Sequence, residues 1–181
     1  IKTNVPVRVR IPEWCHGFGT NKDHTVKGSY ACFEAGEFEV KLTLEHCTEG
    51  HWIAEPIAAS GCPVAGGPTL SPVSKPELRN KSFETAGILD RAGCKVSIIT
   101  DSGVIPQEHL ALCAALAVKG GMDEFSALQA ITINPAQHLG IADRVGSIEV
   151  GKDADMIVCS GNILDTATQV EMVYIDGVRR D

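Results

Sequence analysis

The chain has 181 residues, of which 44% are hydrophobic and 22% are charged, and its formal net charge is −7 at pH 7. This length supports one sizeable hydrophobic core, and the composition is that of an ordinary globular protein. The negative charge argues against nucleic acid or an anionic membrane surface as a partner. The sequence contains no apolar run long enough to span a bilayer and opens with no secretory signal.

Seven cysteines are scattered along the chain and form no C-x-x-C pair, so neither a disulfide framework nor a zinc ribbon is indicated. They stand at positions 15, 32, 47, 62, 94, 113 and 159. Several lie in apolar runs, where a free thiol behaves as a small hydrophobic group. We therefore expect a reducing compartment, the cytoplasm. The sequence begins at Ile1, without Met and directly on an apolar run, which suggests a piece of a longer protein.

The first half of the chain alternates between strand-like and helical patterns. Apolar residues alternate over Val5–Ile11 and again over Phe38–His46, which predicts two strands. Between them, Pro12–Gly36 follows neither a strand nor a helix period, which is unusual for so long a stretch. Trp52–Ala58 has helical spacing, and its Pro56 is tolerated only in the first turn.

The next segments repeat this alternation. Cys62–Ala65 predicts a short strand, and Phe83–Ala92 predicts a helix that Gly93 closes. Cys94–Asp101 predicts a buried strand that ends on a carboxylate, and Pro106–Lys119 predicts a long helix.

The last third changes from helical to β character. Asp123 is expected to cap a helix whose apolar side carries Phe125, Leu128 and Ile131. Asn134 is expected to cap a second helix, with Pro135 at its first position and its end at Gly140. Three short strands are then expected: Ser147–Val150, Asp155–Cys159 and Val170–Ile175.

Strands that alternate with helices in this order predict parallel pairing through right-handed crossovers. Four such strands are half of an eight-stranded barrel. The predicted fold class is therefore α/β: the C-terminal half of a (β/α)8 TIM-type barrel over residues 1–144, covering about strands five to eight. Residues 145–181 are expected to form strands of a small β-sandwich.

From Val40 to Gly177 the chain resembles the amidohydrolase superfamily, and within it the imidazolonepropionase-like branch. Six segments carry the resemblance in order and spacing: L-E-H-C-T-E-G (44–50), G-P-T-L (67–70), L-R-N-K-S-F-E-T (78–85), I-I-T-D (98–101), A-I-T-I-N-P-A (130–136) and R-V-G-S-I-E-V-G-K-D-A-D (144–155). The resemblance implies a metal-dependent hydrolase that acts on C–N bonds of amides or cyclic amides. It also implies zinc or a similar divalent ion, held at the tips of several barrel strands.

Two residues match the family's ligand positions. His46 matches the sixth-strand His, and Asp101 matches the eighth-strand Asp. Asp101 is expected to bind metal and act as general base, and His46 to bind metal or polarise the substrate carbonyl. The alternative for Asp101 is an N-cap of the helix after Pro106, and for His46 a hydrogen-bonded histidine at a strand end.

The alternation of side chains along a strand supports the proposed role of Asp101 but not, without a further irregularity, that of His46. Asp101 shares a face with Ser97 and Ile99, as a residue lining a barrel interior should. His46 shares a face with the apolar Leu44, so its inward orientation requires a local irregularity such as a bulge near Glu45.

Other polar residues carry weaker expectations. Arg79 and Asn80 follow the seventh strand, where they would bind a substrate carboxylate or, as we slightly prefer, only anchor the loop. The remaining histidines lack ligand spacing and are expected to be surface residues: His16, His24, His51, His109 and His138.

The chain departs from the family at its start. Arg10 stands where the fifth-strand His is expected, and a guanidinium cannot replace a neutral imidazole as a ligand. After Asp101, Ser102-Gly103 replaces the His-Pro of the nearest relatives. Residues 10–37 are an insertion, a frameshifted read or an error in the sequence, and we favour the last two because the resemblance ends and resumes sharply.

Two ligands do not hold a catalytic metal, for which about three protein ligands plus water are usual. We therefore expect this chain to be an inactive fragment of the hydrolase, lacking an N-terminal half. A second hypothesis is a truncated, non-catalytic half-barrel that self-associates, because half-barrels expose open sheet edges. A third is a small-molecule binding domain without chemistry.

Overall fold

The computed structural model describes residues 43–180, and before them only the backbone of five short strands. Contacts between Cα atoms divide the chain into two units, Ile1–Lys41 and Leu42–Asp181. Within the described part, no helix is long and apolar enough to cross a membrane.

The first unit is described as two small antiparallel sheets. β1 (Lys2–Thr3) pairs with β5 (Gly36–Glu37), and a second sheet has the order β2 (Val7–Arg10), β4 (Tyr30–Phe33), β3 (His24–Lys27). Val7–Arg10 thus pairs antiparallel to β4, whereas the sequence predicts a strand parallel to its neighbours. A β-branched run fixes the extended backbone but not the direction of its partner, which tertiary pairing decides.

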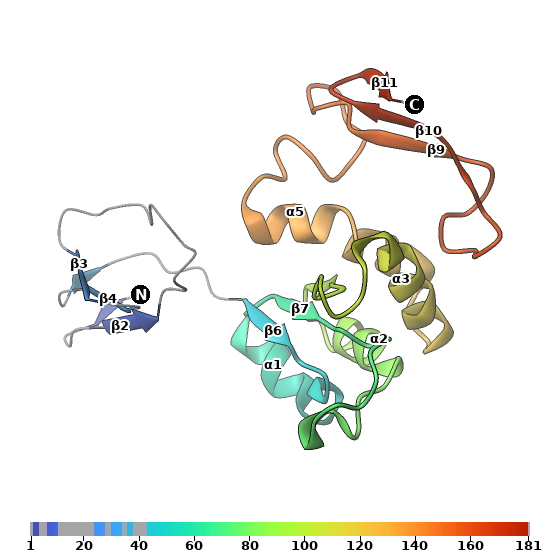
Figure 1. Cartoon of the computed structure of the whole chain (residues 1–181). Coiled ribbons are helices and arrows are strands. Elements are labelled where there is room, and N and C mark those ends of the chain that lie inside the picture. Colours follow the sequence, from blue (N-terminus) through green and yellow to red (C-terminus); the bar gives the residue numbers. More distant parts are fainter. Residues whose placement is uncertain are drawn as a thin grey trace. The chain divides into compact units, whose positions relative to one another are not determined.

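The second unit is built on three parallel strands in the order in which they occur (Figure 1). β6 (Leu44–His46) pairs with β7 (Val64–Gly66), which pairs with β8 (Val96–Ile98). Helix α1 (Ala54–Ser60), preceded by the 3-10 turn η1 (Gly50–Ile53), connects the first pair, and α2 (Glu84–Arg91) connects the second. The predicted strand–helix alternation is confirmed here.

Two apolar clusters hold the helices on this sheet. The first joins α1 and α2 to β7 and β8: Ala54, Ile57, Val64, Leu89, Cys94 and Val96. The second lies around α3 (Leu110–Lys119) and α4 (Glu124–Ala130): Ile98, Ile105, Cys113, Ala114, Ala117, Met122, Ala127 and Ala130. Both clusters draw on β8, which is buried along its whole length.

Helix starts follow the sequence in one case and depart from it in another. Asp123 caps α4 by accepting a hydrogen bond from the Ser126 N–H at 2.9 Å. α5 (Ile133–Leu139) begins before Asn134, so the predicted cap at Asn134 is wrong. The Asn134 side-chain amide donates instead to the Val96 carbonyl at 2.7 Å. It can do so because this side of α5 packs against β8.

The same face of α5 makes two further polar contacts, one with β8 and one with Lys95, the residue before it. Lys95 Nζ donates to Gln137 Oε1 at 2.5 Å, and Ser97 Oγ lies 2.9 Å from His138 Nδ1. Residues 134, 137 and 138 share one side of a helix by their spacing. α5 therefore covers the edge of β8 with hydrogen-bonding groups rather than with another strand.

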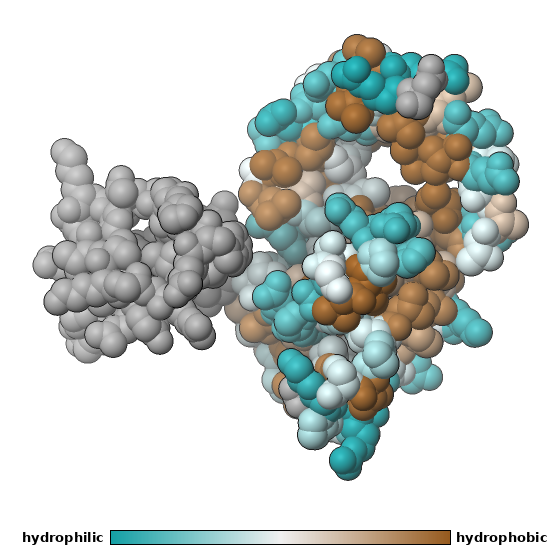
Figure 2. Space-filling view, in the orientation of Figure 1, coloured by the Kyte–Doolittle hydropathy of each residue, from teal (hydrophilic) through white to brown (hydrophobic). Residues whose placement is uncertain are grey.

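The C-terminal residues form a separate antiparallel sheet with the order β11 (Val178–Arg180), β10 (Val170–Ile175), β9 (Met156–Cys159). Ser147–Val150, expected as a strand, is a bend and turn in which Ser147 and Lys152 both contact the Glu149 carboxylate. Figure 2 shows apolar surface over this part of the molecule. Its exposed apolar side chains include Ile148, Ile157, Val158, Val170, Ile175 and Val178.

Replacing Leu89 should destabilise the second unit most directly, because its side chain is fully buried in the first cluster. Leu89→Ala should lower the free energy of unfolding by about 3 kcal/mol through lost burial and the cavity left behind. Leu139→Ala, at a position 74% exposed, is the matched control and should cost less than about 1 kcal/mol. Urea denaturation followed by circular dichroism measures both, and equal losses would contradict the assignment of this core.

His138 should make stability depend on pH. Burial and the nearby Lys95 charge lower its pKa in the fold below the value of about 6.5 expected for the unfolded chain. The unfolded chain therefore binds the proton first, so stability is complete above pH 6.5 and falls as the pH is lowered from there. His138→Gln should lose less stability between pH 7 and pH 5 in thermal melts, and a curve parallel to that of the exposed control His109→Gln would refute this.

Candidate metal and catalytic site

The structure brings His46 and Asp101 together. His46 Nε2 and Asp101 Oδ2 lie 3.5 Å apart, with the two side chains 50% and 41% exposed. His46 ends β6, and Asp101 follows β8, two strands away across the same parallel sheet. Carboxyl ends of parallel strands meet at one edge of a sheet, and this is where α/β barrels carry their reactive groups.

Both residues have a left-handed backbone. The φ angle is 68° at His46, 43° at Cys47 and 52° at Asp101. Histidine and aspartate are among the residues that adopt this region most readily outside glycine. β6 pairs with β7 without interruption from Leu44 to His46, so the left-handed turn, rather than a bulge, gives His46 its direction. Leu44 remains packed on the first cluster.

Asp101 does not cap the helix that follows it. The 3-10 turn η3 (Gln107–His109) begins after Pro106 without a side-chain cap, and α3 follows directly. The Asp101 carbonyl accepts the Val104 N–H at 2.8 Å, which closes a turn and leaves the carboxylate facing His46. The N-cap alternative is therefore wrong for this residue.

A small cavity of about 20 Å³ lies beside His46, large enough for one water molecule. The ends of β6 and β7, the start of α2 and the middle of α3 form its walls. Polar and sulfur-bearing side chains in these walls include His46, Cys47, Thr48, Thr69, Thr85 and Cys113. Burial raises the pKa of the Cys47 thiol.

Hydrogen bonds join the turn after β7 to the end of β6, which carries His46, and to the segment after β8, which leads to Asp101. The Gly67 N–H donates to the His46 carbonyl at 3.0 Å, and the Ile99 N–H donates to the Gly66 carbonyl at 3.0 Å. A Cβ on Gly67 would lie 2.3 Å from the Ile99 carbonyl oxygen, so only glycine permits this approach. The main chain at His46 and the main chain entering Asp101 are thus held by the same turn.

Arg79 and Asn80 lie on the loop between β7 and α2, after the 3-10 turn η2 (Pro76–Leu78). Both are exposed, and neither lines the cavity beside His46. The Asn80 N–H donates to the Glu49 carboxylate at 3.1 Å, which ties this loop to the segment after β6. The contact agrees with an anchoring role and leaves both side chains open to solvent.

The sequence reasoning missed two histidines that are not simple surface residues. His51 Nδ1 lies 2.8 Å from Thr85 Oγ1, and this buried hydroxyl donates to the Thr48 carbonyl at 3.4 Å. His138 contacts Ser97, as described above. The surface expectation is therefore wrong for both, whereas His109 is exposed as expected. No periodicity in the sequence links His51 with Thr85, so only the fold reveals the pair.

The donor set of the pair fits a divalent metal, though incompletely. Imidazole nitrogen and carboxylate oxygen are ordinary zinc ligands, and two donors on one tetrahedral zinc ion lie about 3.4 Å apart. The observed 3.5 Å between His46 Nε2 and Asp101 Oδ2 agrees with that spacing. Within the described residues, no cluster of three or more His, Cys, Asp or Glu side chains occurs that could hold a metal.

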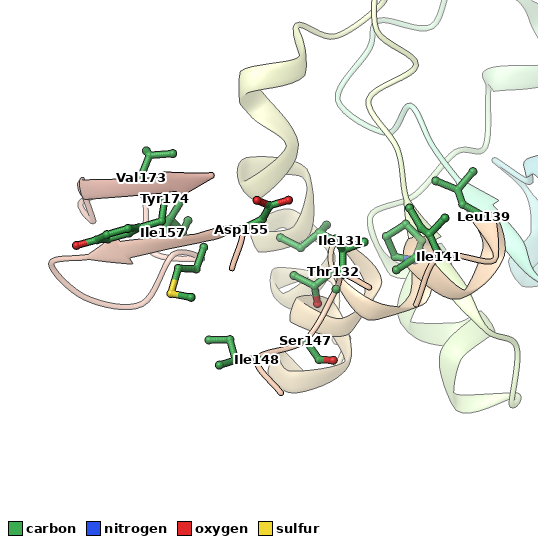
Figure 3. A pocket seen from close by; sticks show the side chains of 15 residues that line it. Ile131, Thr132, Leu139, Ile141, Ser147, Ile148, Asp155, Ile157, Val173 and Tyr174 are labelled. Carbon is green, nitrogen blue, oxygen red and sulfur yellow. The ribbon is translucent and has the colours of Figure 1, made fainter. Parts of the chain in front are cut away.

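A larger cavity of about 570 Å³ lies elsewhere, between α5 and the strands β9 and β10 (Figure 3). Its lining is mostly apolar, including Ile131, Leu139, Ile157 and Val173, and Asp155 is its only carboxylate. It contains neither His46 nor Asp101. Size alone therefore does not identify the reactive site in this chain.

Several expectations lie outside the described residues. The origin of residues 10–37 and the environment of the Arg10 side chain are not described, nor are the side chains of His16 and His24.

Comparisons with known proteins agree on one group. The model of the "Amidohydrolase family" matches residues 12–180. An imidazolonepropionase from Thermoplasma acidophilum is 38% identical over 112 residues, which cover 61% of this chain and 26% of that protein. A crystal structure of an amidohydrolase from Thermotoga maritima is 43% identical with a TM-score of 0.73, covering 76% of this chain and 36% of the other.

A third similar protein was solved with a bound metal ion. An adenosine deaminase from Xanthomonas campestris with bound zinc is 27% identical with a TM-score of 0.55, covering 76% of this chain and 36% of the other. The chain thus spans between about a quarter and somewhat more than a third of the length of these proteins.

Proposed function

Because the chain belongs to the amidohydrolase family, we propose that it is the C-terminal part of a metal-dependent hydrolase that cleaves C–N bonds of amides or cyclic amides. On this proposal β6, β7 and β8 are the sixth, seventh and eighth strands of a (β/α)8 barrel. β9, β10 and β11 belong to the small β-sandwich beside the barrel.

One observation carries the proposal. An imidazole and a carboxylate from two separate strands lie 3.5 Å apart at the carboxyl edge of a parallel sheet, each on a left-handed backbone. Backbone strain of this kind concentrates at functional sites. A solvated histidine and a helix cap would require neither the convergence nor the strain.

In this proposal His46 and Asp101 would hold a divalent ion together with residues of the N-terminal half. Zinc is favoured because the solved deaminase named above contains it. When bound, such an ion lowers the pKa of a water molecule and polarises the substrate carbonyl.

The side chains of this chain then handle the proton. Asp101 Oδ accepts a proton from the attacking water as its oxygen adds to the carbonyl carbon. The protonated carboxyl group passes that proton to the leaving nitrogen when the C–N bond breaks. His46 keeps the carboxylate oriented and, because it is half exposed, lies within reach of the substrate.

The substrate class is proposed only as small amides and cyclic amides, since one fold supports many such reactions. Arg79 and Asn80 lie on an exposed loop after β7, and in this proposal their side chains bind a substrate carboxylate. Imidazolonepropionase is the name of a relative and not of this chain. The substrate that this name implies is the first compound to assay. We also place the protein in the cytoplasm, supported by the free cysteines among the described residues: Cys47, Cys62, Cys94, Cys113 and Cys159.

A second candidate function is a non-catalytic module that self-associates. The apolar side chains exposed on the C-terminal sheet favour it, because contiguous apolar surface commonly marks an interaction site. Size-exclusion chromatography with metal analysis separates the two functions. A metal-free dimer that keeps its state in the presence of zinc supports the module, whereas a monomer that retains zinc only when it is joined to an N-terminal half, and only with His46 and Asp101 intact, supports the hydrolase.

The proposed activity is tested in a chimera in which residues 43–180 replace the corresponding part of the Thermotoga maritima amidohydrolase. We expect the chimera to hydrolyse an amide or cyclic amide in a panel that begins with imidazolonepropionate. Asp101→Asn should lower kcat by roughly 10²- to 10⁴-fold, because the base and acid of the reaction is lost. His46→Gln should lower zinc content, measured by elemental analysis of the purified protein.

The exposed His109 supplies the matched control, and His109→Gln should leave kcat and zinc content unchanged. A folded chimera in which Asp101→Asn retains full activity would refute the role of Asp101. A folded chimera that binds zinc independently of His46 would refute the proposed ligand.

A further inference from the structure

A half-buried lysine lies in the loop that leads from β7 to α2. Lys81 Nζ donates to both the carbonyl and the hydroxyl oxygen of Ser71, the latter at 2.9 Å. Ser71 is only 9% exposed, and burial lowers the pKa of Lys81. A surface lysine usually keeps its ammonium in water. Because Lys81 is partly desolvated and binds both oxygen atoms of Ser71, these hydrogen bonds offset the loss of hydration and fix the position of the side chain.

The contact continues as a chain of hydrogen bonds to the candidate site. Ser71 Oγ donates to the Pro68 carbonyl at 3.2 Å. Pro68 adjoins Gly67, whose N–H donates to the His46 carbonyl at 3.0 Å. Lys81, at the far end of the loop, is thus joined to the main chain of His46 through Ser71, Pro68 and Gly67.

The loop that Lys81 closes supplies part of the site's surroundings. Its first residues, Gly67 and Thr69, line the cavity beside His46. Arg79 and Asn80, the proposed substrate-binding residues, immediately precede Lys81, and the Asn80 N–H is held by the Glu49 carboxylate. Without the ammonium, this loop loses the contact that joins its two ends and gains conformational freedom.

We propose that Lys81 is a positioning residue, which closes the β7–α2 loop on Ser71 and so holds the cavity wall and the Arg79–Asn80 segment beside His46. The consequence for catalysis rests on the proposed hydrolase function, whereas the closure of the loop does not. Lys81 touches neither His46 nor Asp101 and acts only through the loop.

The closure is tested first in the 181-residue chain by amide hydrogen exchange. Lys81→Met should raise the exchange rate of the Gly67 amide and of the 68–80 segment at least 10-fold. The Met122 amide, which donates to Ala117 in the second core cluster, should not change and reports global stability. Lys75→Met removes an exposed lysine from the same loop and should have no effect.

Two further variants separate loop closure from general damage. Lys81→Arg keeps the positive charge and should restore slow exchange to within about threefold of the starting protein. Ser71→Ala removes the hydroxyl acceptor but keeps the carbonyl, so it should give an intermediate rate, and it decides the question if Lys81→Met does not fold. Exchange at Gly67 unchanged within twofold in a folded Lys81→Met or Ser71→Ala variant would overturn the proposal.

The catalytic consequence is measured in the chimera at saturating zinc. Lys81→Met should raise KM at least 10-fold with kcat changed less than threefold, because Asp101 follows β8 and lies outside the loop. Lys81→Arg should recover the KM. An active chimera whose KM is unaffected by Lys81→Met refutes the positioning role, whereas an inactive chimera whose Gly67 exchange still responds refutes the hydrolase function and leaves the loop closure standing.

Discussion

The arrangement of this chain depends on the main chain at the carboxyl edge of its parallel sheet. Glycine at position 67 lets the turn after β7 approach Ile99 so closely that any side chain there would collide with a carbonyl. The same turn donates its N–H to His46. Since β6 and β8 are not neighbours in the sheet, β7 and its turn are what keep their two ends in a fixed relation.

With the two strand ends held by β7 and its turn, the left-handed backbone at His46 and Asp101 determines where the two side chains point. A regular strand end would leave the His46 side chain on the face of Leu44, toward the helices. The positive φ turns it toward Asp101 instead, at an energetic cost that the hydrogen bonds and packing around it offset. The strain and the close approach of the two side chains therefore have the same origin, in the few residues that follow each strand.

Further polar contacts fix the position of the segments around the carboxyl edge of the sheet. Lys81 with Ser71 closes the β7–α2 loop, Glu49 with Asn80 joins that loop to the segment after β6, and Thr85 with His51 joins α2 to η1. Loops tied in this way can present side chains at defined positions although they lie outside regular structure.

The sequence by itself determined the order of strands and helices from β6 to α5, the Asp123 cap and the end of α5 at Gly140, because local periodicity and capping chemistry decide these features. It also singled out His46 and Asp101, through the resemblance that their segments carry. It failed where a side chain's partner is distant: Asn134 bonds a β8 carbonyl rather than capping a helix, and His51 and His138 bond buried hydroxyls.

Only the tertiary structure decided that His46 and Asp101 meet, that Gly67 holds both strands and that Lys81 closes its loop. The physical reason is that each of these contacts joins residues far apart in the chain, whose separation in space no local pattern encodes. The turn of His46 toward Asp101 likewise depends on a single φ angle, which the residue type permits but the surrounding contacts impose.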